Sequence, residues 1–376
     1  MYADQLSLRI EAARRALDAG PRLLARPGDK NARANPEAWT AEEAIREVGS
    51  TLLNQIDISF PRIEGVLLSA ISEQIGTDGL ADLANGDFDH VAILMRNLDA
   101  VHKTSLWHCE RHLGELENSR NAVSYSSAPN PGICGDAGYR DVEACLREDR
   151  KTAIGLDHLL QVRARAVRDQ VMQELSRIRS FGSPPGAIRG TEDSNPSLVK
   201  ALNSASQYFP TDWITESTQQ YPILRIQHLT PQEADDAVGT YWPAGGEEDA
   251  SLIEVPRIGI ATRLHQDPHQ QTLFLATVLH EVSHHFVDIN DTIGCLEEIF
   301  FQRRTGIGAG LIDPSMGGHI EPCPSAGEHD CPSLEVISYG VESLFMGSYG
   351  SLLGLDAQWP ADRDHAAFIL GVLAVA

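Results

Sequence analysis

Apolar residues recur at spacings of three and four along most of the first half of the chain, the pattern of one face of a helix. This periodicity predicts a mainly helical domain over residues 1–181. A run rich in Pro, Gly and Ser follows at 182–197, and these residues interrupt helices and strands alike. We therefore place a linker at 182–197 and a second domain at 198–376. The helices predicted in the first domain span residues 3–19, 38–58, 62–75, 88–119 and 139–180.

The second domain combines the helical spacing with the alternation of apolar and polar residues that is typical of strands. Residues 197–208 have helical spacing, whereas apolar and polar residues alternate over 222–228, as they do in a strand. Short strands at 238–242 and 251–255 flank a Gly-Gly turn and are predicted to form a hairpin. The expected fold class is therefore α+β, with a mainly helical N-terminal domain followed by a domain that has a small sheet and a central helix.

That central helix is predicted from an apolar stretch, residues 270–290, which contains neither Pro nor Gly. Within it His280, Glu281 and His284 form the pattern HExxH. Residues four apart share one face of a helix, so the two imidazoles can hold one Zn²⁺, and the glutamate can take a proton from a nearby water. The pattern predicts metal-assisted hydrolysis, most often of a peptide bond. The alternative is a buried helix whose histidines only form hydrogen bonds.

A catalytic zinc takes three protein ligands, so a third is expected elsewhere in the chain. Glu297 and Glu298 follow the motif too closely to leave room for a turn and a returning helix. Glu335, Tyr339 and Glu342 fall on one face of a later, otherwise apolar predicted helix. Buried acidic residues cost free energy unless they are paired or bound to a metal. Glu335 is therefore the favoured third ligand and Glu342 the second choice, with a purely structural role as the alternative for both.

Other side chains are expected around such a site. Tyr339 is assigned to catalysis as a group that stabilises a developing oxyanion, and His319 and Tyr241 are further candidates for that role. Asp288 lies one turn beyond the motif and is expected to orient a ligand histidine. His285 points about 100° away from its neighbour on the helix, so we expect it to pack or to support the site rather than to bind metal.

The second half of the chain resembles the zincin-like, gluzincin-type domains of phage head-associated and bacterial toxin-like proteins. The resemblance covers roughly residues 197–376, and only HExxH is a specific motif within it. It implies a zincin fold, zinc peptidase chemistry and an edge strand along the cleft, to which an extended substrate can add by backbone hydrogen bonds. The matching segments are Tyr208–Pro210 with Trp213, Gly239–Trp242, Leu279–Phe286 and Glu335–Glu342.

The amino-acid composition narrows the classes of molecule that the protein is expected to bind. The formal net charge of -23 repels a nucleic-acid backbone, so we expect a protein or peptide substrate and no DNA or RNA. The N-terminus lacks the apolar stretch of a signal peptide, and no run approaches the roughly 18 apolar residues of a membrane span. We expect a cytoplasmic protein, or one delivered from the cytoplasm without a conventional signal peptide. The helical N-terminal domain is expected to contact a partner or to inhibit the enzyme.

Two other functions fit the same residues. A zincin fold can persist without turnover in an interaction or assembly protein, although the intact Glu281 argues against this because such a protein has no need of a base. The other alternative is a zinc amidase that acts on a non-peptide substrate, such as a cell-wall crosslink. An edge strand beside the motif favours an extended peptide over that substrate.

Overall fold

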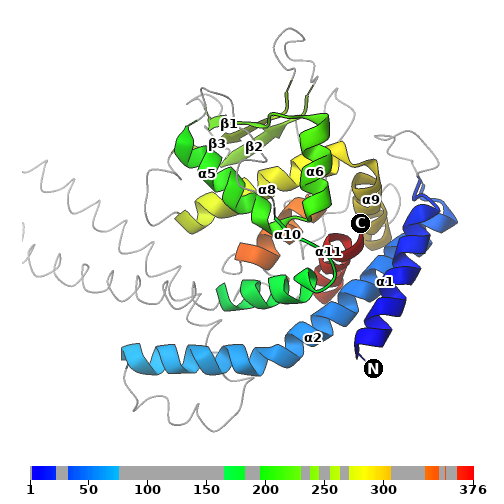
Figure 1. Cartoon of the computed structure of the whole chain (residues 1–376), viewed down its shortest axis with the longest axis horizontal. Coiled ribbons are helices and arrows are strands. Elements are labelled where there is room, and N and C mark those ends of the chain that lie inside the picture. Colours follow the sequence, from blue (N-terminus) through cyan, green and yellow to red (C-terminus); the bar gives the residue numbers. More distant parts are fainter. Residues whose placement is uncertain are drawn as a thin grey trace, which may run out of the picture. The chain divides into compact units, whose positions relative to one another are not determined.

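The computed structural model describes residues 2–22, 33–75, 165–182, 195–229, 238–244, 255–262, 271–305, 335–346, 352 and 362–376. They are mostly helical with a small three-stranded sheet, as the α+β prediction requires. Residues 165–176 are also helical, whereas the helix predicted at 88–119 and the first part of that predicted at 139–180 lie outside the described residues. The named elements (Figure 1) are α1 (Tyr2–Asp18), α2 (Pro36–Ile75), α5 (Pro196–Ala205), η3 (Ser206–Tyr208), α6 (Thr211–Gln220), β1 (Arg225–His228), β2 (Gly239–Trp242), β3 (Arg257–Ile260), α8 (Gln271–Ile289), α9 (Asp291–Thr305), α10 (Val336–Met346) and α11 (Arg363–Val375).

The chain divides into two compact units. The first comprises residues 1–60, 167–354 and 359–376, and the second comprises 61–166 and 355–358. Of the second unit, the structure describes only the end of α2 and residues 165–166. The predicted linker at 182–197 lies largely outside the described residues, so a domain division at that point stays a prediction. The first 60 residues nevertheless belong to the same compact unit as the second half of the chain.

Several helices begin where the sequence supplies a capping side chain. The Asn195 carboxamide oxygen accepts the N–H of Ser197 at 2.9 Å, and Pro196 occupies the first turn of α5. Asn290 ends α8 and starts α9, because its side chain accepts the N–H groups of Thr292 and Ile293 at 3.1 Å. The prediction was wrong at Pro61, where it separated two helices, since α2 runs unbroken through this residue. Proline removes one backbone hydrogen bond and often ends a helix, but here the helical spacing continues on both sides.

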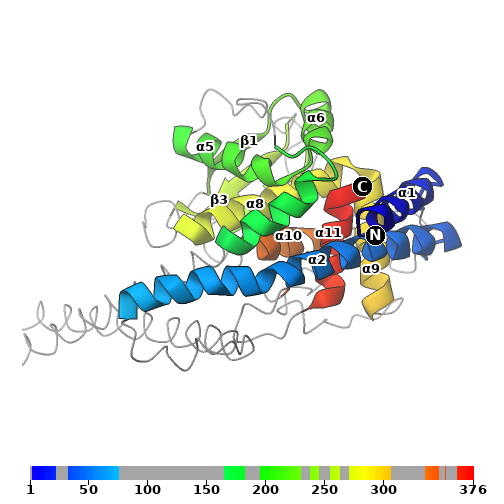
Figure 2. The same cartoon turned by 60° about the horizontal axis from the view of Figure 1, so that its bottom comes forward.

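Helix α11 is buried along almost its whole length, and α2 crosses it with the two backbones in direct contact (Figure 2). A Cβ atom added to Gly49 would lie 1.6 Å from the carbonyl oxygen of Ala367. A Cβ atom added to Gly371 would lie 2.1 Å from the carbonyl oxygen of Ile45. Only glycine fits at these two positions, so α2 is anchored to the C-terminal helix.

A network of ion pairs spans the same junction. The carboxylate of Glu42 is 1% exposed and accepts from Arg46 Nε at 2.8 Å and from Arg303 Nε at 3.1 Å. Asp364 pairs with the same two arginines, at 3.3 and 2.5 Å. A buried charge is tolerated when it is fully paired, as Glu42 is. The network joins α2, α9 and α11.

The sheet has the order β1-β3-β2, with β1 parallel and β2 antiparallel to β3. The strand predicted at 238–242 is present as β2, and it pairs antiparallel with β3. The predicted partner strand at 251–255 lies almost wholly outside the described residues, so that pairing is not tested. Figure 1 shows α8 between the sheet and α10, and α8 packs against both. Helix α8 therefore lies at the centre of this unit.

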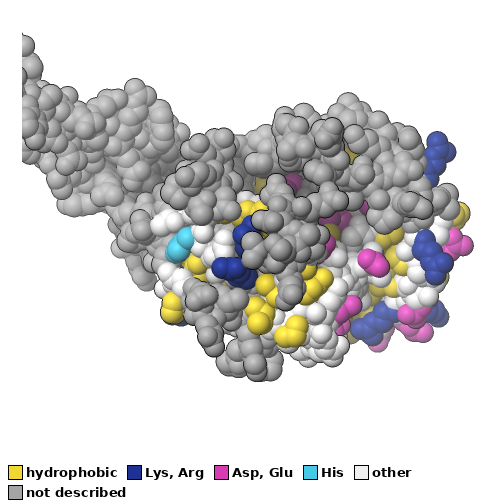
Figure 3. Space-filling model, turned by 90° about the horizontal axis from the view of Figure 1, so that it is seen from above, with side chains coloured by type: hydrophobic (Ala, Val, Ile, Leu, Met, Phe, Trp, Pro, Cys, Tyr) yellow, Lys and Arg dark blue, Asp and Glu magenta, His cyan; other side chains and the backbone are white. Residues whose placement is uncertain are grey.

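The surface carries charges of both signs. Across the described part of the face in Figure 3, basic, acidic and hydrophobic side chains are interspersed. This mixture differs from the basic stripe typical of nucleic-acid binding. Among the helices that the structure describes, none combines the length and apolar character needed to cross a membrane.

Candidate metal centre

Helix α8 places the two motif histidines on the face that meets α10. His280 and His284 are one turn apart, and their Nε2 atoms lie 3.2 Å from each other. The imidazole rings meet edge to face, with centroids 4.9 Å apart. Both rings therefore turn the same nitrogen towards one point between α8 and α10.

Glu335 completes this group from the residue that directly precedes α10. Its Oε2 atom lies 2.9 Å from His280 Nε2 and 3.3 Å from His284 Nε2. The three atoms thus form a nearly equilateral triangle, and in the described part of the chain these residues are the one group with metal-binding geometry. A tetrahedral zinc with bonds of 2.0–2.1 Å holds its ligand atoms about 3.3 Å apart. The donor types and their spacing fit a zinc ion.

The pKa values of the group are shifted in opposite directions. Burial lowers the pKa of His280, but hydrogen bonds to Glu335 and Glu342 outweigh burial and raise it well above its ordinary value. Burial raises the pKa of Glu335, but the two histidines outweigh burial and lower it. Both shifts favour a positive charge held between the imidazoles and the carboxylate. A divalent cation satisfies the same preference.

Glu342, the second choice for the third metal ligand, lies outside this triangle. Its Oε2 atom lies 3.0 Å from Nδ1 of His280, the ring nitrogen that points away from the triangle. A carboxylate there accepts the Nδ1 proton, which leaves the Nε2 lone pair free to bind a metal. The structure therefore places Glu335 with the candidate ligands and Glu342 behind one of them.

Glu281 lies beside the triangle and is 5% exposed. No donor among the described residues forms a hydrogen bond with its carboxylate. Burial raises its pKa, an effect that His280 and His284 partly offset. A buried carboxylate without a hydrogen-bond partner costs free energy, and such a group is well suited to accept a proton from a reactant.

Strand β2 runs directly against Glu281. A Cβ atom added to Gly239 would lie 2.5 Å from Glu281 Oε1, so a larger residue would displace the carboxylate or the strand. The N–H of Ala261 donates to the carbonyl of Val238, which makes that pair a hydrogen-bonded one. Because such pairs alternate along an antiparallel ladder, the N–H and C=O groups of Gly239 and Tyr241 point away from β3. In the described sheet, β2 thus has a free edge next to Glu281.

A chain of hydrogen bonds, buried at its Ser217 end, ties β2 to α8 and α6. Ser217 Oγ lies 2.7 Å from His285 Nε2, and Tyr241 Oη lies 3.2 Å from His285 Nδ1. The Tyr241 hydroxyl donates to Asp288 at 2.8 Å. Burial lowers the pKa of His285 to about 4, so its ring is neutral near pH 7 and can accept from Ser217 while donating to Tyr241.

This chain corrects two predicted roles. Asp288 binds Tyr241 and does not orient a ligand histidine. Tyr241 is held in the chain rather than facing the triangle as an oxyanion group. His285 packs against Tyr241 and Phe286, which is one of the two roles predicted for it, and Ser217 is a partner that no local pattern in the sequence indicated. Tyr339 lies one turn beyond Glu335 on α10 and is half-buried, while His319 lies outside the described residues.

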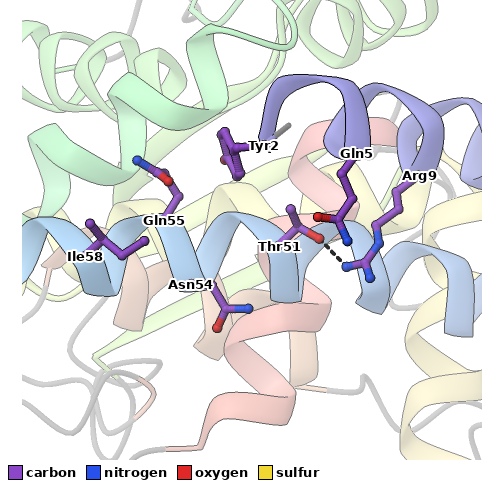
Figure 4. A pocket seen from close by; sticks show the side chains of 7 residues that line it. All are labelled: Tyr2, Gln5, Arg9, Thr51, Asn54, Gln55 and Ile58. Carbon is purple, nitrogen blue, oxygen red and sulfur yellow. Dashed lines mark hydrogen bonds between the residues drawn. The ribbon is translucent and has the colours of Figure 1, made fainter.

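A pocket elsewhere in the unit offers no comparable chemistry. It lies between α1 and α2, where Arg9 hydrogen-bonds to Thr51 (Figure 4). Its lining contains amides, hydroxyls, one guanidinium and one aliphatic side chain, with no His, Cys, Asp or Glu. The lining residues are Tyr2, Gln5, Arg9, Thr51, Asn54, Gln55 and Ile58.

Within the part of the chain that the structure describes, three features lie together: three side chains that could hold a metal, a buried carboxylate without a hydrogen-bond donor, and an edge of β2 without a paired strand. No family model matches the chain, and no curated protein or solved structure matches it either.

Proposed function

We propose that this protein is a zinc-dependent peptidase of the zincin type. The observation that carries the proposal is the triangle of His280, His284 and Glu335 directly beside a buried glutamate that no described residue hydrogen-bonds. These three side chains would hold Zn²⁺. When bound, the metal would supply Lewis acidity, which polarises a scissile carbonyl and makes a water easier to deprotonate.

Glu281 is the general base in this proposal. It takes a proton from the attacking water, whose oxygen adds to the carbonyl carbon, and it then passes that proton to the amine as the C–N bond breaks. Its raised pKa, caused chiefly by burial, suits a group that must accept and then release a proton. Glu342 keeps the proton of His280 on Nδ1, so that Nε2 stays available as a ligand atom.

The edge of β2 to which no described strand pairs supports a peptide as the substrate class, although the Gly239 carbonyl there already accepts the Thr240 hydroxyl at 2.7 Å. An extended peptide can add to this edge and form backbone hydrogen bonds with Gly239 and Tyr241. Such an arrangement would bring a peptide bond past Glu281, because Gly239 lies against its carboxylate. A non-peptide amide would use little of this edge, so it remains the second candidate substrate.

Metal removal tests the proposal. Zinc-loaded protein is expected to cleave unfolded casein, treatment with EDTA is expected to abolish cleavage, and added Zn²⁺ is expected to restore it. Peptide products are measured by mass spectrometry, with Mg²⁺ as the control ion because it prefers oxygen ligands in octahedral geometry. Zinc-loaded protein that leaves both casein and a broad peptide mixture intact would favour the interaction or assembly function.

A further inference from the structure

Glu297 is the most deeply buried acidic residue near the candidate metal centre that the proposed chemistry does not use. It lies on α9 and is 2% exposed. Its Oε1 atom accepts the backbone N–H of Ile337 at 2.8 Å. Burial raises the pKa of Glu297 to about 8, so keeping a carboxyl group here is costly.

The N–H group of Ile337 that Glu297 accepts belongs to the first turn of α10. The first backbone N–H groups of a helix have no partner within the helix, and the side chain of the preceding residue usually accepts one of them. Here that residue is Glu335, whose carbonyl accepts the first helical hydrogen bond from Tyr339. Its carboxylate turns instead towards His280 and His284.

Glu335 therefore cannot serve both as a metal ligand and as the cap of its own helix. Ser338 donates its hydroxyl proton to Glu335 Oε2 at 2.9 Å, which helps to orient the ligand oxygen but leaves the helix end open. Glu297 on the neighbouring helix α9 accepts a backbone N–H of this first turn instead. Because α9 also packs against α8, one helix contacts both elements that carry the candidate ligands.

We propose that Glu297 is a positioning residue that fixes the first turn of α10 and thereby holds Glu335 at the metal centre. This proposal rests on the zinc site of the proposed function. Residues that orient metal ligands typically change metal affinity by 10–100-fold when they are replaced. Glu297 holds the backbone N–H of Ile337, two residues after the candidate ligand Glu335.

Three substitutions test this role by zinc affinity, measured by competition with a chromophoric chelator. Glu297→Gln keeps an acceptor oxygen at the same reach, so its affinity is expected to stay within about threefold of wild type. Glu297→Ala removes the acceptor, and Glu297→Asp withdraws it by one carbon, so each is expected to bind zinc about 10–100-fold more weakly. Glu298→Ala removes a neighbouring carboxylate that contacts Gln302 and is expected to have no effect.

A spectroscopic readout separates positioning from stability. Cobalt(II) in place of zinc gives an intense visible absorption in a four-coordinate site, which should weaken in Glu297→Asp and persist in Glu297→Gln. Equal zinc affinity in wild type, Glu297→Asp and Glu297→Ala would overturn the proposal, whatever the melting temperatures. If the Ala variant fails to fold, Glu297→Asp and Glu297→Gln still decide the question. A wild type that binds no zinc would overturn the proposed function as well, whereas equal binding by all variants overturns this proposal alone.

Discussion

Replacement of Glu281 by Gln is expected to lower casein cleavage by the zinc-loaded protein by a factor of roughly 10²–10⁴. The amide has nearly the same shape as the carboxylate but cannot accept the proton of the attacking water. Glu281 is not among the three side chains whose donor atoms converge, so zinc content is expected to stay unchanged. The effect should appear in kcat, because the lost interaction belongs to the transition state.

Two measurements make this result decisive. Zinc content is determined on the same samples as the cleavage rate, so a loss of metal cannot be mistaken for a loss of the base. Glu298→Gln makes the identical chemical change on α9 and should retain full activity. Full activity in Glu281→Gln would exclude this residue as the base and would contradict the proposed mechanism.

Replacement of Gly49 by Ala is expected to destabilise the fold by about 3 kcal/mol or more. The added Cβ atom would lie 1.6 Å from the carbonyl oxygen of Ala367, and the obstacle is backbone rather than a flexible side chain. Helices α2 and α11 would have to separate, which would also disturb the ion pairs of Glu42 and Asp364. Urea unfolding followed by circular dichroism measures the loss.

Gly294→Ala is the matched control for this prediction. At that position the added Cβ atom would lie 3.4 Å from the nearest atom, the carbonyl oxygen of Val287, which is an ordinary contact. Alanine also favours a helix by about 1 kcal/mol relative to glycine, so stability should be unchanged or slightly higher. If Gly49→Ala behaves like this control, the first 60 residues do not pack against α11 as the structure describes.

Local patterns in the sequence predicted much of the fold. The helical spacing of residues 270–290 is realised as α8, and the alternation at 222–228 as β1. The same patterns predicted His280, His284 and Glu335 as candidate ligands, because polar side chains on an otherwise apolar helix face indicate a functional role. The structure brings these three together although Glu335 lies more than one helix away in sequence.

Contacts between distant segments could not be predicted in the same way. Nothing near Gly49 indicates that α11 will cross it, since a lone glycine within a helical pattern has many uses. Which of Glu335 and Glu342 lies with the candidate ligands depends on which ring nitrogen of His280 each one reaches. The role of Glu297 likewise depends on how α9 and α10 pack, which the spacing of either helix leaves undetermined.

The zinc content of the purified protein tests the central claim most directly. Mass spectrometry would be applied to wild type, Glu335→Ala and Glu342→Ala under identical conditions. The account predicts about one zinc per chain in the wild type, its loss in Glu335→Ala, and retained but 10–100-fold weaker binding in Glu342→Ala. A wild type that is free of zinc and takes up none when it is added would contradict the account.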